Sequence, residues 1–206
     1  MTDLTRGWAN GPAVHDDVRV PVPASDLSAA LQAAQRGDED GFRTLYRAVQ
    51  PGLLRYLRVL APQDADDVAS ETWLQIARDV GKFRGDGDDF RGWATTIARN
   101  RALDVHRRQS RRPPVDGDFD VLAEIAGPDD TAYDAATALA TEEALQLISQ
   151  LPQDQAEAVL LRVVVGLDAN RAAEILGKKP GAVRTSAYRG LNRLSEMLTD
   201  YRPRHA

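Results

Sequence analysis

The sequence predicts an all-α protein with two small helical domains joined by a flexible acidic linker, the C-terminal domain being a helix-turn-helix. Apolar residues recur at helical spacing along most of the chain, and no segment requires a strand. Residues 99–112 hold six Arg against one Asp, residues 113–140 hold seven acids and no Lys or Arg, and residues 171–193 hold six Lys or Arg against one Glu. Two basic blocks around an acidic one indicate anionic partners for both domains, although solvated helix faces with a soluble linker are an open alternative.

Composition places the chain among globular proteins and excludes several classes. Its 206 residues, 43% hydrophobic and 28% charged, suffice for one medium domain or two small ones. The absence of cysteine excludes disulfides and thiolate metal sites, and we expect no metal and no cofactor. The N-terminus lacks the apolar core of a signal peptide, and no run approaches membrane-spanning length. We therefore expect a cytoplasmic protein that does not insert into membranes. A net charge of −5 argues against a histone-like binder.

Proline, glycine and charge mark the domain boundaries. The first residues scatter Gly and Pro without periodicity, which is typical of a flexible arm, although Trp8 and Val18 could dock elsewhere. Pro113 and Pro114 end the first helical unit. The expected segments are a flexible arm (1–24), a first helical domain (25–112), an acidic linker (113–134) and a second helical domain (135–200). Apolar linker residues form a candidate docking patch: Phe119, Val121, Leu122 and Ile125.

Five helices are expected in the first domain, because capping residues and prolines separate its apolar stripes. Pro51 suits the first turn of a helix, so we expect one helix to end before it and another to start there. Pro62 stops that third helix. The expected helices run from 25 or 26 to about 36, from 38 as far as Pro51, from Pro51 to Pro62, from about 64 to 80, and from about 89 to 111.

Four helices are expected in the second domain. The first begins near Ala135, and Pro152 suits the first turn of the next, which runs to about Val165. Its end, residues 163–165, is all valine and would also suit a strand, but no partner strand lies nearby, so we expect helix. The last two helices are expected at 168–176 and 180–199.

The helix at 64–80 has a charged face that contains one large apolar residue. On a helical wheel Leu74 falls next to Asp67 and Arg78, with Glu71 close by. The expected core side is opposite: Ala65, Ala69, Thr72, Ile76 and Val80. An apolar side chain ringed by charges is typical of a protein-binding surface, and a lone exposed leucine is the alternative.

The helix at 89–111 turns basic at its end. Asn100, Asp104, Arg107 and Arg111 share one face, and small residues suited to close packing lie opposite: Ala94, Ala98 and Ala102, with Val105. Asn can pair with adenine, and Arg with guanine or phosphate. Four Arg without an acid in residues 107–112 favour an anionic partner over a solvated face.

The loop before this helix contains Gly85 and Gly87 between Phe83 and Phe90. A pocket framed by the two phenylalanines could take an unstacked base. From the residues alone, an ordinary connection between helices is the alternative.

Residues 177–180, Gly-Lys-Lys-Pro, join two helices in a helix-turn-helix pattern. The second helix has an expected core side: Val183, Ala187, Leu191, Leu194 and Leu198, with Gly190 allowing a close crossing. Its polar side would enter a major groove: Arg184, Thr185, Tyr188, Arg189 and Asn192. Lys178 and Lys179 would contact phosphates. Helical hairpins without a DNA function are the alternative.

Together these segments resemble the extracytoplasmic-function sigma factors of bacterial RNA polymerase, from about Leu27 to Leu198. Their order and spacing make the resemblance specific, although each motif alone is modest. The motifs are Asp64-Ala65-Asp66-Asp67-Val68 with Glu71-Thr72-Trp73-Leu74, Phe83-Arg84, Phe90-Arg91-Gly92-Trp93, Ile97-Ala98-Arg99-Asn100 with Asp104 and Arg107-Arg108, Leu151-Pro152, Ala172-Ala173-Glu174-Ile175-Leu176-Gly177, and Gly181-Ala182-Val183-Arg184.

The resemblance implies sigma region 2 at 25–112, sigma region 4 at 135–200, and a protein without catalytic activity that directs core RNA polymerase to promoters and helps to melt the DNA. It implies a surface for the clamp helices of the largest polymerase subunit: Asp66, Asp67, Glu71, Leu74 and Gln75. It implies contacts to the minus-ten element: Phe83, Arg84, Asp86, Arg99, Asn100, Asp104, Arg107, Arg108 and Arg111. It implies contacts to the minus-thirty-five element: Lys178, Lys179, Arg184, Thr185, Tyr188, Arg189 and Asn192. It also implies a linker in the RNA-exit region and an anti-sigma factor as a further partner.

Two positions depart from the family's pattern. Ser186 stands where a basic residue is frequent, and Asn170-Arg171 replaces a commoner aromatic-acid pairing. We expect these departures to bear on promoter specificity.

A free-standing DNA-binding regulator and an enzyme are the two alternative classes of function. A free-standing helix-turn-helix regulator would need neither the acidic helix with Leu74 nor the basic block after Asn100. An enzyme such as a nuclease is disfavoured, because His15, His106 and His205 are scattered and no carboxylate pair falls in an expected pocket.

Overall fold

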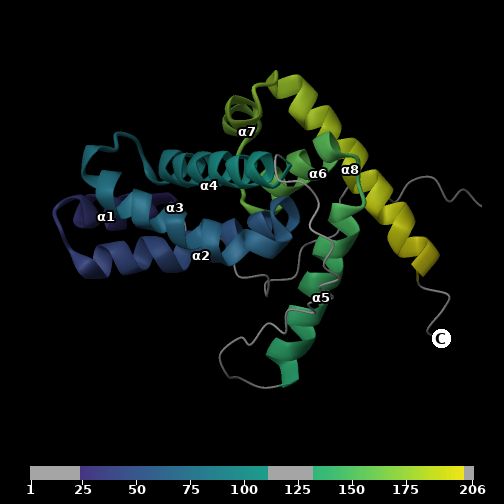
Figure 1. Ribbon diagram of the computed structural model, residues 1–206, viewed down its shortest axis with the longest axis horizontal. Coiled ribbons are helices and arrows are strands. Elements are labelled where there is room, and N and C mark those ends of the chain that lie inside the picture. The colour runs from purple at the N-terminus through teal and green to yellow at the C-terminus, as the bar shows by residue number, and fades with distance from the viewer. Residues whose placement is uncertain (1–23, 111–131, 202–206) are drawn as a thin grey trace, which may run out of the picture.

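The computed structural model describes residues 24–110 and 132–201, and every regular element in these two stretches is helical (Figure 1). The all-α prediction is confirmed for them. The helices are α1 (Ala24–Gln35), α2 (Glu39–Leu60), α3 (Ala65–Asp79), α4 (Gly87–Ser110), α5 (Ala132–Ser149), α6 (Gln153–Val159), α7 (Ala169–Leu176) and α8 (Pro180–Tyr201). The expected N-terminal arm lies outside the described residues except for Ala24, which begins α1. The expected linker lies outside them except for residues 132–134, which begin α5.

The first four helices form one packed group around α2, which contacts α1, α3 and α4. The α2 side chains that face the group repeat at intervals of three or four residues: Leu45, Val49, Leu53, Tyr56 and Leu57, all buried. Asp38 begins the helix, because its Oδ1 accepts hydrogen bonds from the backbone N–H groups of Asp40 (2.8 Å) and Gly41 (3.2 Å). The periodic apolar face and the N-cap therefore account for α2.

The predicted break at Pro51 is wrong, because α2 continues through it as one helix of 22 residues. Proline lacks the N–H that would bond to residue 47, and its ring disturbs the preceding turn. Pro51 is exposed, however, so its ring faces solvent while Val49 and Leu53 stay buried on either side. Burial of one continuous apolar face outweighs the lost hydrogen bond.

The boundaries of α3 and α4 agree closely with the sequence. A short 3₁₀ turn at Pro62–Asp64 precedes α3, and another at Val80–Lys82 follows it. The N-terminus of α4 is capped by two carboxylates. Asp86 Oδ1 accepts from the Asp89 N–H at 2.8 Å, and Asp89 Oδ2 accepts from the Asp86 N–H at 3.0 Å. The predicted core faces are confirmed, since all the predicted positions of α3 and the following turn and Ala94, Ala98 and Ala102 of α4 are buried; Val105 is partly buried.

The last four helices form a second group. The helix expected up to Val165 is confirmed as helix rather than strand, with α6 continuing into a π-helical turn at Leu160–Val164. Asp168 caps α7, and Gly177 ends it in the left-handed conformation, with φ +62°. α8 crosses α6 at Gly190, where an added Cβ would lie 2.7 Å from Val159 Cγ2.

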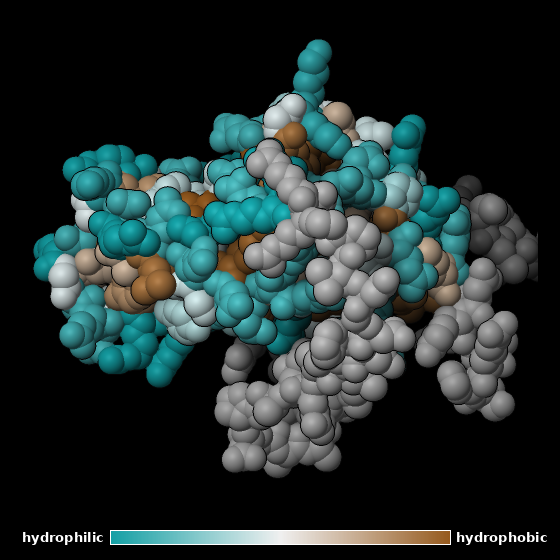
Figure 2. Space-filling view, viewed as in Figure 1, coloured by the Kyte–Doolittle hydropathy of each residue, from teal (hydrophilic) through white to brown (hydrophobic). Residues whose placement is uncertain are grey.

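The predicted core side of α8 is correct in part. Val183 and Ala187 are buried and Leu194 is partly buried against the core, but Leu191 and Leu198 are 45% and 52% exposed. Leu198 is exposed because α8 extends past α6 and α7 (Figure 1), whereas Leu191 lies at the edge of a face that is still covered at Gly190 and Leu194. The visible face of the molecule is mostly hydrophilic, with small hydrophobic patches that include one over α8 (Figure 2).

The two groups also contact each other. α7 lies against α4, while α5 and the π-helical turn pack against α2 (Figure 1). The approach is close at Gly52 of α2, where an added Cβ would lie 3.1 Å from the backbone oxygen of Val164. One continuous core of buried residues therefore runs through both groups.

Candidate functional site

The predicted protein-binding face of α3 is exposed. Leu74 is 62% exposed, and Asp66, Asp67 and Glu71 around it are also exposed. The opposite side of α3 is buried by α2 and α4. The sequence-based expectation of an apolar side chain within an acidic surface is therefore confirmed in geometry.

Arg101 of α4 orders part of this face, and the sequence analysis did not identify it. Its Nη1 donates to Glu71 Oε2 at 2.5 Å, and its Nη2 donates to Gln75 Oε1 at 2.9 Å. A second contact joins the C-terminal end of α4 to the turn before α3, since Gln109 Nε2 donates to Asp64 Oδ2 at 2.8 Å. These contacts depend on how α3 packs on α4, so no local pattern in the sequence indicates them.

The loop between α3 and α4 does not form a slot between its two phenylalanines. Phe90 is fully buried, and the rings of Phe83 and Phe90 meet edge to face with centroids 5.9 Å apart. The Phe83 ring also stacks on Trp93, with ring centroids 4.9 Å apart. The rings thus fill the space between them, and the exposed residues between the two phenylalanines are Arg84, Gly85 and Asp86.

Helix α1 supports this loop from behind. Gln35 Nε2 donates to the backbone oxygens of Phe83 (2.9 Å) and Val80 (3.3 Å), and the Gly87 N–H donates to Ser28 Oγ at 2.9 Å. Sequence reasoning missed Ser28 and Gln35, because each side chain bonds to backbone about fifty residues away.

The outer face of α4 presents most of the expected DNA-binding residues. Asn100, Asp104, Arg107 and Arg108 are exposed, and Arg107 Nη1 pairs with Asp104 Oδ1 at 3.1 Å. Arg111 lies outside the described residues.

Arg99 differs from its neighbours on α4. Its Nε and Nη2 donate to Glu157 Oε2 at 3.1 and 3.0 Å, and its side chain is only 19% exposed. The structure therefore directs this arginine toward the second group of helices and away from solvent.

The helix-turn-helix presents all seven expected residues to solvent: Lys178, Lys179, Arg184, Thr185, Tyr188, Arg189 and Asn192. Tyr188 is 67% exposed, and Thr185 Oγ1 donates back to the Gly181 oxygen at 3.0 Å. The positive φ of Gly177 and the cap at Asp168 hold α7 and thereby the turn that leads into α8.

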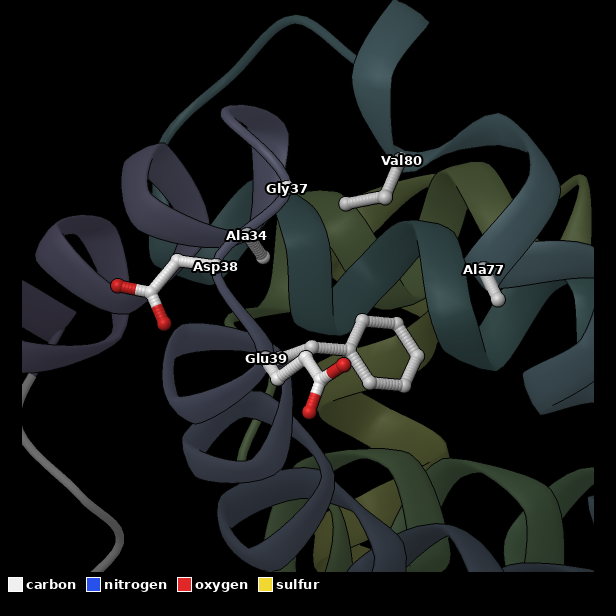
Figure 3. Close-up of a pocket in the computed structure, with 7 residues that line it drawn as sticks. Ala34, Gly37, Asp38, Glu39, Ala77 and Val80 are labelled. Carbon is white, nitrogen blue, oxygen red and sulfur yellow. The ribbon is translucent and has the colours of Figure 1, made fainter.

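A shallow hollow of about 250 Å³ lies apart from these surfaces (Figure 3). The α1–α2 turn, with Asp38 and Glu39, forms one side of it, and the end of α3, with Ala77 and Val80, forms the other. The hollow contains none of the residues expected to bind polymerase or DNA.

No group of three His, Cys, Asp or Glu residues within 24–110 and 132–201 is placed to hold a metal ion. In the same residues, no helix is both long and apolar enough to cross a bilayer.

Comparisons with known proteins match both helical groups. Residues 45–112 match the model of Sigma-70 region 2, and residues 141–194 match that of Sigma-70 region 4. The chain is 33% identical to the ECF RNA polymerase sigma factor BldN of Streptomyces coelicolor, over 86% of this chain and 70% of BldN. It is 32% identical to the ECF sigma factor SigD of Mycobacterium tuberculosis, over 84% of each.

Solved structures support the same fold. CnrH, in complex with the cytosolic domain of CnrY, aligns with a TM-score of 0.58 and 22% identity, over 85% of this chain and 99% of CnrH. The sigma factor RpoE of Bartonella quintana, in complex with NepR, aligns with a TM-score of 0.56 and 22% identity, over 78% of this chain and 98% of RpoE. The chain therefore belongs to the ECF sigma factors, a non-enzymatic family, and directs RNA polymerase to promoters for transcription initiation.

Proposed function

We propose that the two functions of region 2 are divided between the facing helices α3 and α4. The exposed face of α3 binds the clamp helices of the largest polymerase subunit through Asp66, Asp67, Glu71, Leu74 and Gln75. The single observation that carries this assignment is Leu74, which is 62% exposed among carboxylates on a helix whose other side is buried. An apolar anchor within a charged rim is the arrangement that protein interfaces favour.

The exposed fraction of Leu74 sets how much its burial can contribute to the free energy of binding polymerase. Full burial of a leucine side chain contributes about 1.5–3 kcal/mol. Since about two thirds of Leu74 remains to be covered by a partner, we expect its burial to contribute about 1–2 kcal/mol to the binding free energy, or roughly 5- to 30-fold in affinity.

The test is the affinity of the purified protein for core RNA polymerase. Leu74→Ala and Glu71→Lys should each weaken binding at unchanged melting temperature. Val163→Ala is the matched control, because Val163 is also exposed (59%) but lies in the second group. Unaltered polymerase binding in both α3 variants would show that this face is not the interface.

We propose that the minus-ten element contacts Phe83, Arg84 and Asp86 in the loop and the outer face of α4: Arg99, Asn100, Asp104, Arg107, Arg108 and Arg111. We propose that α8 enters the major groove at the minus-thirty-five element through Arg184, Thr185, Tyr188, Arg189 and Asn192, while Lys178 and Lys179 contact phosphates. A bidentate Asn or Arg contact discriminates among bases by about 1–3 kcal/mol. Run-off transcription on genomic fragments would identify the promoters and locate both elements.

We propose domain boundaries at 25–112 and 135–200, with 113–134 as an acidic linker whose last three residues belong to the first turn of α5. We also propose that the protein acts in the cytoplasm with its polymerase. We also propose an anti-sigma partner, since CnrH and RpoE, which share the fold, were solved with CnrY and NepR. A tandem pulldown that recovers polymerase and no other stoichiometric protein would contradict the proposal of an anti-sigma partner.

A further inference from the structure

Arg101 lies on α4, the helix proposed to bind DNA, but its side chain turns toward α3. It is 26% exposed, whereas Arg107 on the outer face of α4 is 67% exposed. Its Nη1 donates to Glu71 Oε2 and its Nη2 donates to Gln75 Oε1, so the guanidinium bonds two residues that lie one helical turn apart on α3. The arginine therefore contacts the face that is proposed to bind polymerase.

The third donor of the Arg101 side chain is left unused. Among the described residues, its buried Nε has no hydrogen-bond partner. A buried N–H without an acceptor destabilises a folded protein, so stability alone does not account for this placement of the side chain. The placement is the one that directs both Nη groups at Glu71 and Gln75.

The contact with Arg101 decides which atoms of α3 remain available to a partner. A guanidinium has only donors, so the amide oxygen of Gln75 faces Arg101 and Nε2 is left as a donor. Glu71 gives its Oε2 to Arg101, while its Oε1 accepts no hydrogen bond from the part of the chain that the structure describes. One donor and one acceptor are thus held in fixed positions beside the exposed Leu74.

We propose that Arg101 is a positioning residue for polymerase binding, which holds Glu71 and Gln75 in the orientation in which the clamp helices meet them. The inference rests on the proposed assignment of the α3 face to polymerase. A side chain that is already ordered loses less conformational entropy when a partner binds, so preorganisation raises affinity without a new contact. The partner surface that fits has an apolar pocket for Leu74, an acceptor for Gln75 Nε2 and a donor for Glu71 Oε1.

DNA is the alternative partner for Arg101, because the residue lies within the basic block of residues 99–112. Its geometry argues against a phosphate contact, since both Nη groups are committed to α3. The two roles differ in salt dependence. An arginine that neutralises a phosphate contributes about one to the slope of log DNA affinity against log salt, and a residue that positions α3 side chains contributes nothing to it.

The experiment measures the affinity of purified full-length variants for core RNA polymerase. Arg101→Met removes the donors and keeps an unbranched side chain, and it should lower the affinity about 3- to 10-fold. Arg101→Lys should recover only part of this loss, because an ammonium lacks the fixed fork that bonds two partners at once. Arg43→Gln is the matched control, since it removes an arginine whose ion pair, with Asp40, lies within α2. Circular dichroism verifies that each variant is folded.

A double-mutant cycle separates positioning from a direct contact between Arg101 and polymerase. Gln75→Ala should weaken polymerase binding in the wild type and have a smaller effect in the Arg101→Met background, where the amide is no longer oriented. Two losses that add in full overturn the inference, and so does an unchanged affinity in folded Arg101→Met.

The DNA arm uses promoter DNA and polymerase that is saturating at every salt concentration. Arg101→Met should leave the salt slope of promoter binding unchanged, and a slope lower by about one overturns the inference in favour of a phosphate contact. Failure of the proposed function appears separately, as polymerase binding that is unaltered in Leu74→Ala and Glu71→Lys. If the inference alone fails, those two variants still bind polymerase more weakly than wild type.

Discussion

Replacement of Gly41 by alanine should loosen the first helical group at the contact between α1 and α2. An added Cβ would lie 2.6 Å from Ala33 Cβ, 2.8 Å from the Ala34 nitrogen and 2.9 Å from the Ala30 oxygen. Two of these atoms belong to the backbone of α1, so the whole helix has to move. Overpacking of this kind costs about 1–3 kcal/mol, and alanine recovers up to about 1 kcal/mol in helix propensity. We expect a net loss of about 1–2 kcal/mol, which corresponds to about 2–8 °C in melting temperature.

Tryptophan fluorescence during urea unfolding measures this change in the right part of the molecule. The three tryptophans all precede residue 111, and two of them, Trp73 and Trp93, lie in α3 and α4. Gly181→Ala is the matched control, because an added Cβ there meets no atom within 4 Å and alanine should only favour the helix. A Gly41→Ala protein as stable as wild type would refute the argument that close approach of the helices requires glycine at this position.

Three further predictions follow from individual contacts. Gln35→Ala removes the donor to the backbone oxygens of Phe83 and Val80, so it should weaken binding of single-stranded minus-ten DNA while polymerase affinity, measured in parallel, stays unchanged. Lys178→Ala should reduce the slope of log affinity against log salt for minus-thirty-five duplex DNA by about one, without changing the preferred sequence. The backbone N–H of Arg171 holds the pKa of Asp168 below its usual range, so the charged cap stabilises the protein above a pH of about 4 and is lost as pH falls through the lowered pKa. The difference in unfolding free energy between wild type and Asp168→Asn should therefore shrink in acid, as pH-dependent urea titrations would measure.

Local chemistry made most of the helices predictable. Asp38, Asp168 and Gly177 act at helix ends as their side chains and backbone freedom indicate, and the structure agrees with each. The helical wheel placed Leu74 outside and Ile76 inside, because α3 has one neighbour-facing side along its whole length.

The errors arose where tertiary context overrode a local rule. Pro51 lies on the solvent side of α2, a fact that depends on which face α1, α3 and α4 cover. Leu191 and Leu198 have the right spacing for a core and are nevertheless exposed. A helical wheel carries no information about how far the neighbouring helices cover α8.

Residues that act across long distances in the sequence were also missed. Arg101 and Gln35 bond to partners 26 to 48 residues away, so no window of sequence contains both members of a pair. Arg171 was identified as unusual, yet its contact with Asp89 requires the two domains to meet.

Two sets of hydrogen bonds couple α4 to α3, so that the two helices move together. Arg101 bonds to Glu71 and Gln75, and Gln109 bonds to Asp64. α4 has 24 residues and a length of about 36 Å, so a rotation of about 5° transmitted from α3 displaces its far end by about 3 Å, the length of a hydrogen bond. On the proposed assignment of α3 to polymerase and α4 to DNA, the angle at which the protein binds polymerase would set which base edges Asn100 and Arg107 can reach. Substitutions of buried residues that pack under α3, in contact with neither polymerase nor DNA, would then alter the choice of promoter by changing the tilt of α4.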